Sequence, residues 1–383
     1  MAYKFLLPKN TVMGENALSF AEDIIKNLGH KAFIVTGKNV TASGLVKKLT
    51  DSLIGWGIAY EIFNDIIGEP TVAMIKAGVL EFKEKKCDFL IALGGGSPLD
   101  SAKAIAAMTV LSGEISDYMG KEINGCFPPM VLIPTTAGTG SEATKFTIIT
   151  DTEKDIKMLL KGDALIPDLA VIDSEFTVTS PPGITAATGM DALTHAVEAY
   201  TSRKANPLTD LYALDAIKRI FCYLPSAYKD GENRRAREEM AIAAYEAGIC
   251  INNSSVTLVH GMSRPIGALF HVPHGISNAM LITECLKFAL DGCYKKFADI
   301  ARAIGAADDT ADDEKAANML IAALEELCRS LDIPTLEGYG ISKEKFDSLT
   351  DKMATDAIAS GSPANTIKSV DKEAVISIYK KLW

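Results

Sequence analysis

Four residues of this 383-residue chain have side chains that suit metal binding, and three of them are histidines, of which the chain has five. Asp191 and His195 lie four residues apart in a stretch rich in Ala, Leu and Val, which predicts a helix. Residues four apart leave the same helix face one turn apart, so the carboxylate and the imidazole can hold one ion together. The other two residues are His260 and His274, further along the chain.

One carboxylate with up to three imidazoles suits a divalent first-row metal, Fe(II) or Zn(II), because calcium and magnesium prefer shells of oxygen atoms. Each residue also has an ordinary interpretation on its own. Asp191 could cap a helix after Gly189, and the histidines could be partly buried residues without a ligand. Taken together, and with the glycine-rich turn described next, the set favours a metal-dependent active site.

A glycine-rich turn with the sequence GGGSP, residues 94–98, follows an apolar run that ends at Leu93. Glycines let backbone amides approach an anion, Ser97 could cap the following helix, and Pro98 suits the first helical position. The helix N-terminus would then face a pyrophosphate. The turn matches neither Gly-x-Gly-x-x-Gly nor the Gly-Lys-Ser/Thr ending of an NTPase loop, and a purely structural role is the alternative.

A second loop, TTAGTGSE at residues 135–142, follows the next apolar run. Ligands of open α/β sheets bind outside the carboxyl ends of the strands, so we expect the two loops to face one ligand. A solvent-exposed turn is the alternative for each loop.

The first half of the chain alternates apolar runs with amphipathic patterns, which predicts a parallel sheet with helices on its faces. The predicted strands are residues 32–36, 58–63, 89–93, 130–133 and 169–173, with helices at 44–56, 71–86 and 98–111 and a hairpin formed by 146–150 and 156–160.

The sequence Pro-Pro-Gly at residues 181–183 ends this alternation, and almost purely helical patterns follow. The predicted helices are residues 187–202, 207–224, 234–252, 276–289, 292–303 and 312–330. We therefore predict an α/β domain over residues 1–180 and a helical, metal-binding domain over residues 181–383.

Composition excludes several classes of protein. A net charge of −10 without any basic run leaves nothing to neutralise a phosphate backbone, which argues against nucleic-acid binding. Seven scattered cysteines without a Cys-x-x-Cys pair favour neither a disulfide framework nor a zinc ribbon. No signal peptide or membrane span is evident, so we expect a cytoplasmic protein without membrane association.

The ordered motifs resemble the iron-containing, metal-dependent (group III) alcohol dehydrogenases, which share a fold with glycerol dehydrogenase and dehydroquinate synthase. The resemblance extends from end to end and rests on residues 94–100, 134–142 and 189–198 and on His260 and His274. It implies a dehydroquinate synthase-like fold: an α/β N-terminal dinucleotide-binding domain with a parallel, Rossmann-like sheet, and an all-α C-terminal domain.

The resemblance also implies roles for single residues. It makes Asp191, His195, His260 and His274 the metal ligands, with Fe(II) expected ahead of Zn(II). The residues implied to contact the NAD(P) cofactor are Gly95, Gly96 and Ser97 at the phosphates, Asp100 in the same motif, Thr135, Thr136 and Thr139 nearby, and Lys157 at the ribose. His195 favours the alcohol dehydrogenase branch, because the glycerol dehydrogenase pattern generally lacks that ligand, and dehydroquinate synthase has a glutamate in place of Asp191.

Two positions depart from the family pattern. Many members carry a proton-relaying histidine four residues after the third ligand, where this chain has Arg264, which cannot release a proton at working pH. His271 is then the candidate for that role, and Pro265 predicts a bend or an end of the helix that carries Arg264. Members that prefer NAD often have an acidic residue after the first strand, where this chain has Gly37 followed by Lys38. NADP should therefore be tolerated or preferred.

From these features we expect an NAD(P)-dependent alcohol dehydrogenase or aldehyde reductase acting on small aliphatic alcohols, diols or aldehydes, such as lactaldehyde/1,2-propanediol, 1,3-propanediol or butanol. Three alternatives stay open. They are a reductase of a small anionic aldehyde such as succinic semialdehyde or sulfoacetaldehyde, a metal- and NAD-dependent lyase of the dehydroquinate synthase type, and a catalytically silent metal-binding protein. Family members are commonly homodimers or larger homo-oligomers.

Overall fold

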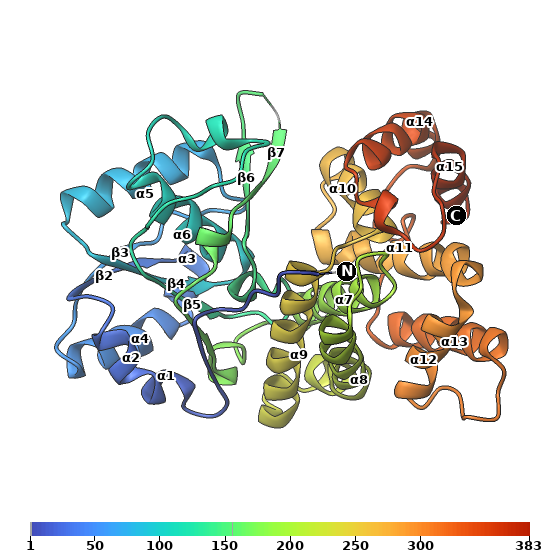
Figure 1. Cartoon of the computed structure of the whole chain (residues 1–383), viewed down its shortest axis with the longest axis horizontal. Coiled ribbons are helices and arrows are strands. Elements are labelled where there is room, and N and C mark those ends of the chain that lie inside the picture. Colours follow the sequence, from blue (N-terminus) through green and yellow to red (C-terminus); the bar gives the residue numbers. More distant parts are fainter. Residues whose placement is uncertain (1, 155) are drawn as a thin grey trace. The chain divides into compact units, whose positions relative to one another are not determined.

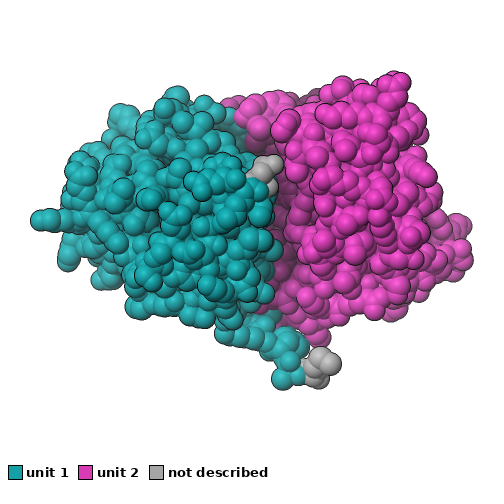
Figure 2. Space-filling view, turned by 90° about the horizontal axis from the view of Figure 1, so that it is seen from above, with its two compact units in different colours: residues 1–180 teal, residues 181–383 magenta. Residues whose placement is uncertain are grey.

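The computed structural model describes residues 2–154 and 156–383. The chain divides into two compact units, residues 1–180 and residues 181–383, which Figure 2 draws in different colours.

The first unit contains a six-stranded parallel sheet with the strand order β1-β8-β5-β4-β2-β3. The strands are β1 Asn10–Met13, β2 Lys31–Val35, β3 Ala59–Phe63, β4 Phe89–Gly94, β5 Met130–Pro134 and β8 Leu169–Ile172. Every residue of the central strands β4 and β5 is buried, as is usual for a parallel sheet covered on both faces. The predicted parallel sheet is confirmed.

Alternate residues of the strands enter two different cores. Phe33 and Val35 of β2 pack with α5 (Val72–Glu84) and α6 (Gly96–Met108), whereas Ala32 and Ile34 pack with helices on the opposite face. Those helices are α1 Ala17–Phe20, α2 Glu22–Lys26 and α4 Leu45–Gly55, and Figure 1 shows the two layers around the blue and teal strands. The sheet is therefore the middle layer of a three-layer unit, and the loops at the carboxyl ends of its strands are held by this packing.

The remaining elements of the first unit are short. The predicted hairpin is confirmed as the antiparallel pair β6 (Phe146–Asp151) and β7 (Ile156–Lys161). A short helix, α3 Lys38–Ala42, and four 3₁₀ segments complete the unit; the segments are η1 Ile115–Tyr118, η2 Ser141–Ala143, η3 Asp163–Leu165 and η4 Ser174–Phe176. Strand β1 and helices α1 to α3 were not predicted: a helix of four or five residues is too short to show the 3.6-residue period, and β1 contains only two apolar residues.

In its described residues the second unit is helical, with no strand longer than an isolated bridge, as the sequence predicts. Its helices are α7 Pro182–Tyr200, α8 Pro207–Lys229, α9 Arg234–Asn253, α10 Leu258–Phe270, α11 His274–Ala289, α12 Tyr294–Ala303, α13 Asp313–Ser330, α14 Lys343–Ala359 and α15 Lys372–Lys380. Two 3₁₀ segments, η5 Leu290–Gly292 and η6 Pro363–Asn365, lie between helices. No helix of the described residues is both long enough and apolar enough to cross a membrane.

Prolines set the main differences from the predicted helix boundaries. Helix α7 begins at Pro182, five residues earlier than predicted, because proline is well suited to the first turn of a helix. Helix α8 passes through Pro225 and ends at Lys229, and α10 passes through Pro265 and ends at Phe270. The helix therefore does not end at Pro265, although proline has no N–H to donate to the Gly261 carbonyl. The bend that was the other expectation stays a prediction.

Candidate active site

Three helices of the second unit bring the four predicted metal ligands together. Helix α7 contributes Asp191 and His195, α10 contributes His260, and His274 is the first residue of α11. The first three residues are buried, and the His274 side chain is 41% exposed. The cluster therefore lies at the edge of the helical core, where the His274 side chain remains open to solvent.

The donor atoms of Asp191, His195 and His260 all lie within 4.8 Å of one another, which suits a single ion, and His274 is placed by its distance from Asp191. Oδ1 of Asp191 lies 3.6 Å from Nε2 of His260, 3.6 Å from Nε2 of His274 and 3.8 Å from Nε2 of His195. Tetrahedral ligands about 2.1 Å from one metal are about 3.4 Å from each other. The donor types and their spacing thus fit a divalent first-row metal.

The charges of the cluster keep its carboxylate ionised. Burial alone would raise the pKa of Asp191, but the imidazoles of His195 and His274, together with a hydrogen bond to His260, hold that pKa below its usual value. An ionised carboxylate is the form that a metal requires.

Glu198, to which the sequence analysis assigns no role, lies behind His260. Its Oε2 is 2.5 Å from Nδ1 of His260, and its Oε1 accepts hydrogen bonds from Thr257 Oγ1 (2.7 Å) and Val259 N (2.6 Å). Burial of this carboxylate would raise its pKa, but the attraction of the His260 imidazole and the hydrogen bonds from His260 and Thr257 lower it. Glu198 therefore places the proton of His260 on Nδ1 and leaves the lone pair of Nε2 for a metal. The sequence feature that could have identified Glu198 is its position seven residues after Asp191, which places both carboxylates on the same face of the helix.

Asn278 is a second residue without a predicted role, one turn after His274 on α11. Its Nδ2 lies 2.7 Å from Oδ1 of Asp191 and 3.3 Å from Nε2 of both His260 and His274. The amide therefore faces three of the four donor atoms at hydrogen-bonding distance. The amide has two hydrogens, one for Asp191 Oδ1 and one that can point to an imidazole lone pair, which agrees with the proton that Glu198 holds on Nδ1 of His260.

Close contact between α7 and α11 depends on Gly275. A Cβ atom at this position would lie 2.0 Å from the carbonyl oxygen of Ala187, which is backbone and cannot move aside. Any side chain would push α11 away from α7, and with it His274 away from Asp191 and His195.

The two remaining site candidates of this unit lie on or at the end of α10. Arg264 is one turn after His260, and its Nη1 donates a hydrogen bond to Ser362 Oγ at 3.1 Å. His271 ends the helix with a positive φ of 56°, and its side chain is exposed. No contact among the described residues joins His271 to the four donors, so its part in proton transfer stays a prediction.

In the first unit, the glycine-rich turn leads directly from β4 into α6. The helix begins at Gly96 with Gly95 as an extended N-cap residue, so Ser97 and Pro98 lie inside its first turn. The predicted capping by Ser97 and the first helical position of Pro98 are therefore wrong by two residues. Gly94 is required by packing, because a Cβ atom there would lie 2.5 Å from Cγ of Pro98.

The turn and the second loop lie side by side. The amide of Thr135 donates to the carbonyl of Gly94 at 2.9 Å. A Cβ atom on Gly95 would be 3.4 Å from Oγ1 of Thr136, and one on Gly96 would be 3.0 Å from Cγ2 of Thr139. The backbone of the turn and the threonine side chains thus form one surface, which an anion can approach from the carboxyl end of the sheet.

Asp100 on α6 stabilises this surface through hydrogen bonds to the second loop and to β6. Its Oδ1 accepts a hydrogen bond from Ser141 Oγ at 2.6 Å, and its Oδ2 accepts one from the amide of Ile148 at 2.8 Å. Both carboxylate oxygens therefore hold the second loop and β6 against α6.

Lys103, one turn further along α6, is a buried cation that the sequence analysis did not identify. Its Nζ donates to the carbonyl oxygens of Ser141 (2.6 Å), Thr144 (2.7 Å) and Phe146 (2.9 Å), and lies 3.1 Å from Oγ1 of Thr144. Burial lowers the pKa of Lys103 to about 8. The ammonium group of Lys103 therefore holds three carbonyl groups of the second loop and β6 in place by hydrogen bonds. The carboxylate of Asp100 does the same for hydrogen-bond donors of these segments.

Gly37 and Lys157, both predicted to lie near the cofactor ribose, each have an acidic neighbour on the segment that follows β3. Gly37 forms a bridge with Asp65, and Nζ of Lys38 lies 3.9 Å from Oδ1 of Asp65. Nζ of Lys157 lies 2.5 Å from Oε1 of Glu69. Carboxylates from the segment after β3 thus lie beside both predicted ribose-contact positions.

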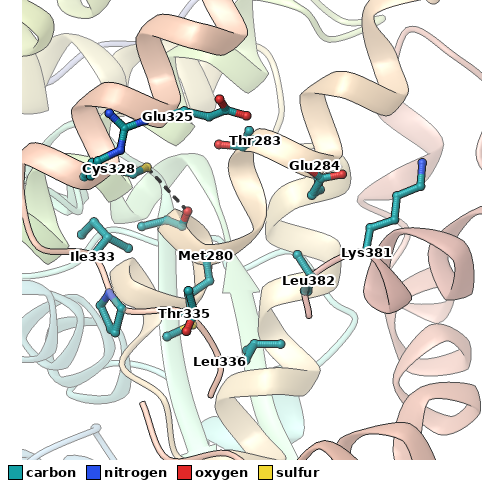
Figure 3. A pocket seen from close by; sticks show the side chains of 13 residues that line it. Met280, Thr283, Glu284, Glu325, Cys328, Ile333, Thr335, Leu336, Lys381 and Leu382 are labelled. Carbon is teal, nitrogen blue, oxygen red and sulfur yellow. Dashed lines mark hydrogen bonds between the residues drawn. The ribbon is translucent and has the colours of Figure 1, made fainter. Parts of the chain in front are cut away.

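A pocket of about 380 Å³ lies between α11, α13 and the C-terminal residues, and Figure 3 shows its lining. Its labelled residues are Met280, Thr283, Glu284, Glu325, Cys328, Ile333, Thr335, Leu336, Lys381 and Leu382. None of the four metal-ligand candidates lines it, and we assign it no role in the chemistry.

Comparisons with known proteins agree with this arrangement. Residues 8–174 match the family model for iron-containing alcohol dehydrogenase, and residues 185–383 match the model for the C-terminal part of the Fe-containing alcohol dehydrogenase family. The chain is 35% identical to a lactaldehyde reductase of Escherichia coli (strain K12), with the whole length of both proteins covered.

Two solved structures also have the fold of this chain. A 1,3-propanediol oxidoreductase is 34% identical and superposes with a TM-score of 0.96 over the full length of both chains. A sulfoacetaldehyde reductase from Bifidobacterium kashiwanohense, solved in complex with NAD+, is 28% identical and superposes with a TM-score of 0.90, covering 100% of this chain and 99% of the other. The chain therefore belongs to the iron-containing alcohol dehydrogenase family, and the protein is an oxidoreductase of the alcohol dehydrogenase and aldehyde reductase type.

Proposed function

We propose that this enzyme interconverts small aliphatic aldehydes and alcohols with NAD(P)H and a divalent metal bound by Asp191, His195, His260 and His274. The observation that carries the proposal is the set of donor separations, 3.6 to 3.8 Å from Asp191 Oδ1 to three imidazole nitrogens. Fe(II) is the first candidate because of the family, and Zn(II) suits the same donors. The similar lactaldehyde reductase and 1,3-propanediol oxidoreductase support lactaldehyde and short diols as first substrates, and butanal is tested beside them.

A bound metal of this kind supplies Lewis-acid stabilisation of the oxygen that gains negative charge when a carbonyl is reduced. The protein residues mainly position groups. Glu198 holds the proton of His260 on Nδ1, and the charge on Asp191 balances part of the charge of the cation. In the first unit, Asp100 and Lys103 hold the threonine loop beside the glycine-rich turn, where we expect the cofactor phosphates.

The preference between the two nicotinamide cofactors depends on a pair of opposite charges. We expect NADPH to be accepted at least as well as NADH, because Gly37 carries no carboxylate and Lys38 can attract a 2′-phosphate. Asp65 opposes this effect, since its carboxylate is 3.9 Å from the Lys38 ammonium group. We further expect a homodimer or larger homo-oligomer in the cytoplasm, which light scattering after size exclusion and cell fractionation can test.

A panel of aldehydes, incubated with the metal-loaded protein and either NADH or NADPH, tests the proposed function. Net cofactor oxidation with alcohol formed supports a reductase. Product formed while the cofactor is unchanged would instead indicate a lyase of the dehydroquinate synthase type. Neither product nor cofactor oxidation, with metal bound, would indicate a silent metal-binding protein.

A further inference from the structure

Arg264 is a partly buried cation with few partners in the part of the chain that the structure describes. Its Nη1 donates one hydrogen bond, to Ser362 Oγ at 3.1 Å, and no described carboxylate lies within ion-pairing distance. A guanidinium group carries five N–H donors and keeps its charge at any working pH. Most of the N–H donors of Arg264, and its positive charge, can therefore interact with solvent or with a bound ligand.

Other shielded arginines of the same unit are better satisfied. Arg219 pairs with Asp215, Glu239 and Glu246. Arg237, which is 3% exposed, donates to the Gly231 carbonyl at 2.9 Å and to Thr185 Oγ1 at 2.8 Å. Arg264 makes one such hydrogen bond, so its other N–H donors and its charge suit a negatively charged ligand.

The carboxylate that acts on Arg264 electrostatically is that of Glu198, which already binds other groups. Burial lowers the pKa of Arg264, and the charge of Glu198 offsets only part of this shift. Both oxygens of Glu198 bind His260, Thr257 and Val259. Glu198 therefore cannot serve as the missing counter-ion without releasing His260.

The position of Arg264 connects it with the metal-ligand cluster. His260 and Arg264 are four residues apart on α10 and share one face of the helix. Ser362 precedes η6, and the neighbouring Pro363 is so close to α10 that a Cβ atom on Gly261 would lie 2.7 Å from its ring. Arg264 and Ser362 thus form a polar pair beside the helix that carries a metal-ligand candidate.

We propose that Arg264 and Ser362 bind the anionic end of the substrate, a short aldehyde with a carboxylate or sulfonate group. This inference rests on the proposed function. A planar guanidinium group binds such oxyanions through two parallel hydrogen bonds. The Ser362 hydroxyl accepts from Arg264 and still has its own proton to donate to the same anion. A phosphate of the cofactor is the other source of an oxyanion, and the experiments below distinguish the two.

Steady-state kinetics of the wild type and the Arg264→Met variant test the proposal. KM for succinic semialdehyde and sulfoacetaldehyde should rise roughly 10- to 100-fold, the loss expected for a charged hydrogen bond, while KM for butanal changes less than about twofold. Arg264→Lys should recover part of the loss, and Ser362→Ala should lose part of it. Equal impairment on butanal and on the anionic aldehydes would overturn the proposal. A rise in the KM for NAD(P)H alone would assign the anion to the cofactor and would also overturn it.

Calorimetry makes the test independent of turnover. Succinate and ethanesulfonate, titrated into the metal-loaded protein, should bind the wild type and lose affinity in Arg264→Met. The matched control is Arg237→Met, which removes a more deeply buried arginine with protein partners and should leave anion binding unchanged. Failure of the wild type to reduce any aldehyde would refute the proposed function alone, because calorimetry still decides the anion site. Absence of binding to the wild type would refute the anion site.

Discussion

Oε2 of Glu198 lies 2.5 Å from Nδ1 of His260, and this contact decides which ring nitrogen of the histidine is available to a metal. Both side chains are buried, and Nε2 of the same ring lies 3.6 Å from Oδ1 of Asp191. Because Asp191 and Glu198 both belong to α7, one helix supplies a candidate ligand and also orients the next one.

Glu198→Gln should lower the affinity for Zn(II) or Fe(II) by 10- to 100-fold, the usual effect of losing a carboxylate behind a metal-bound histidine. Competition with a chromophoric chelator measures this affinity. Glu246→Gln is the matched control, since Glu246 is a shielded glutamate of α9 that pairs with Arg219 instead. Equal metal affinity in Glu198→Gln and wild type would contradict the orienting role.

His260→Ala and His274→Ala should each lower metal occupancy and abolish hydride transfer while the helical content is retained. His274→Ala is the cleaner variant, because its side chain is 41% exposed and adds little to the core. Metal analysis and circular dichroism check both parts of this prediction. Normal turnover by a metal-free His260→Ala protein would refute the assignment of the ligands.

Lys103→Met should loosen the second loop, since three carbonyl groups lose the ammonium group that they share. We expect the free energy of unfolding to fall by about 2 to 4 kcal/mol, given the cost of unsatisfied buried acceptors, and KM for the cofactor to rise. Urea unfolding and cofactor titrations measure the two effects. Lys76→Met, which removes an exposed lysine paired with Glu114, should change neither. A Lys103→Met protein with an unchanged cofactor KM would show that the loop does not need this brace.

Glu142 should make the protein less stable as pH rises from about 4.5 to 7. Burial raises its pKa from 4.5 to about 7, and its Oε2 has no hydrogen-bond partner among the described residues. Between these two values the folded state holds a proton that the unfolded state has released, so the free energy of unfolding falls as pH increases from about 4.5 to 7. Glu142→Gln should therefore stabilise the protein by up to about 3 kcal/mol at pH 8 and have no effect near pH 4.5. Parallel pH profiles for wild type and variant, from denaturant unfolding, would contradict this prediction.

Asp65→Asn should raise the ratio of kcat/KM for NADPH to that for NADH, because it frees Lys38 for a 2′-phosphate. The pair is exposed and 3.9 Å apart, so a shift of up to about fivefold is expected. Gly37→Asp should shift preference toward NADH, but a Cβ atom there would lie 3.0 Å from the Ile66 carbonyl oxygen, so the backbone must also adjust. A strong preference of the wild type for NADH would show that the cofactor contact lies elsewhere.

The sequence predicted those parts of the site that depend on local spacing. Asp191 and His195 are one helical turn apart, and a glycine run after a buried strand is visible without any structure. The partners of these groups depend on contacts between distant segments: Glu198 meets a histidine 62 residues away, and Lys103 meets carbonyl groups about 40 residues away. A glutamate or a lysine on a helix face looks the same in a sequence whether it is solvated or buried against such a partner.

Boundaries at prolines and glycines were predicted less well. Pro98 was expected to begin a helix that begins at Gly96, and Pro265 was expected to bend or end a helix that in fact continues to Phe270. Both errors arise because tertiary packing offsets a local preference of proline, and neither changes which side chains meet at the site.

Removal and replacement of the metal test the central claim most directly. The enzyme should lose aldehyde-dependent NAD(P)H oxidation when dialysed against a chelator and recover it when Fe(II) or Zn(II) is returned, with occupancy measured in the same samples. An unchanged rate in protein shown by elemental analysis to contain no metal would contradict the claim that Asp191, His195, His260 and His274 form a catalytic metal site.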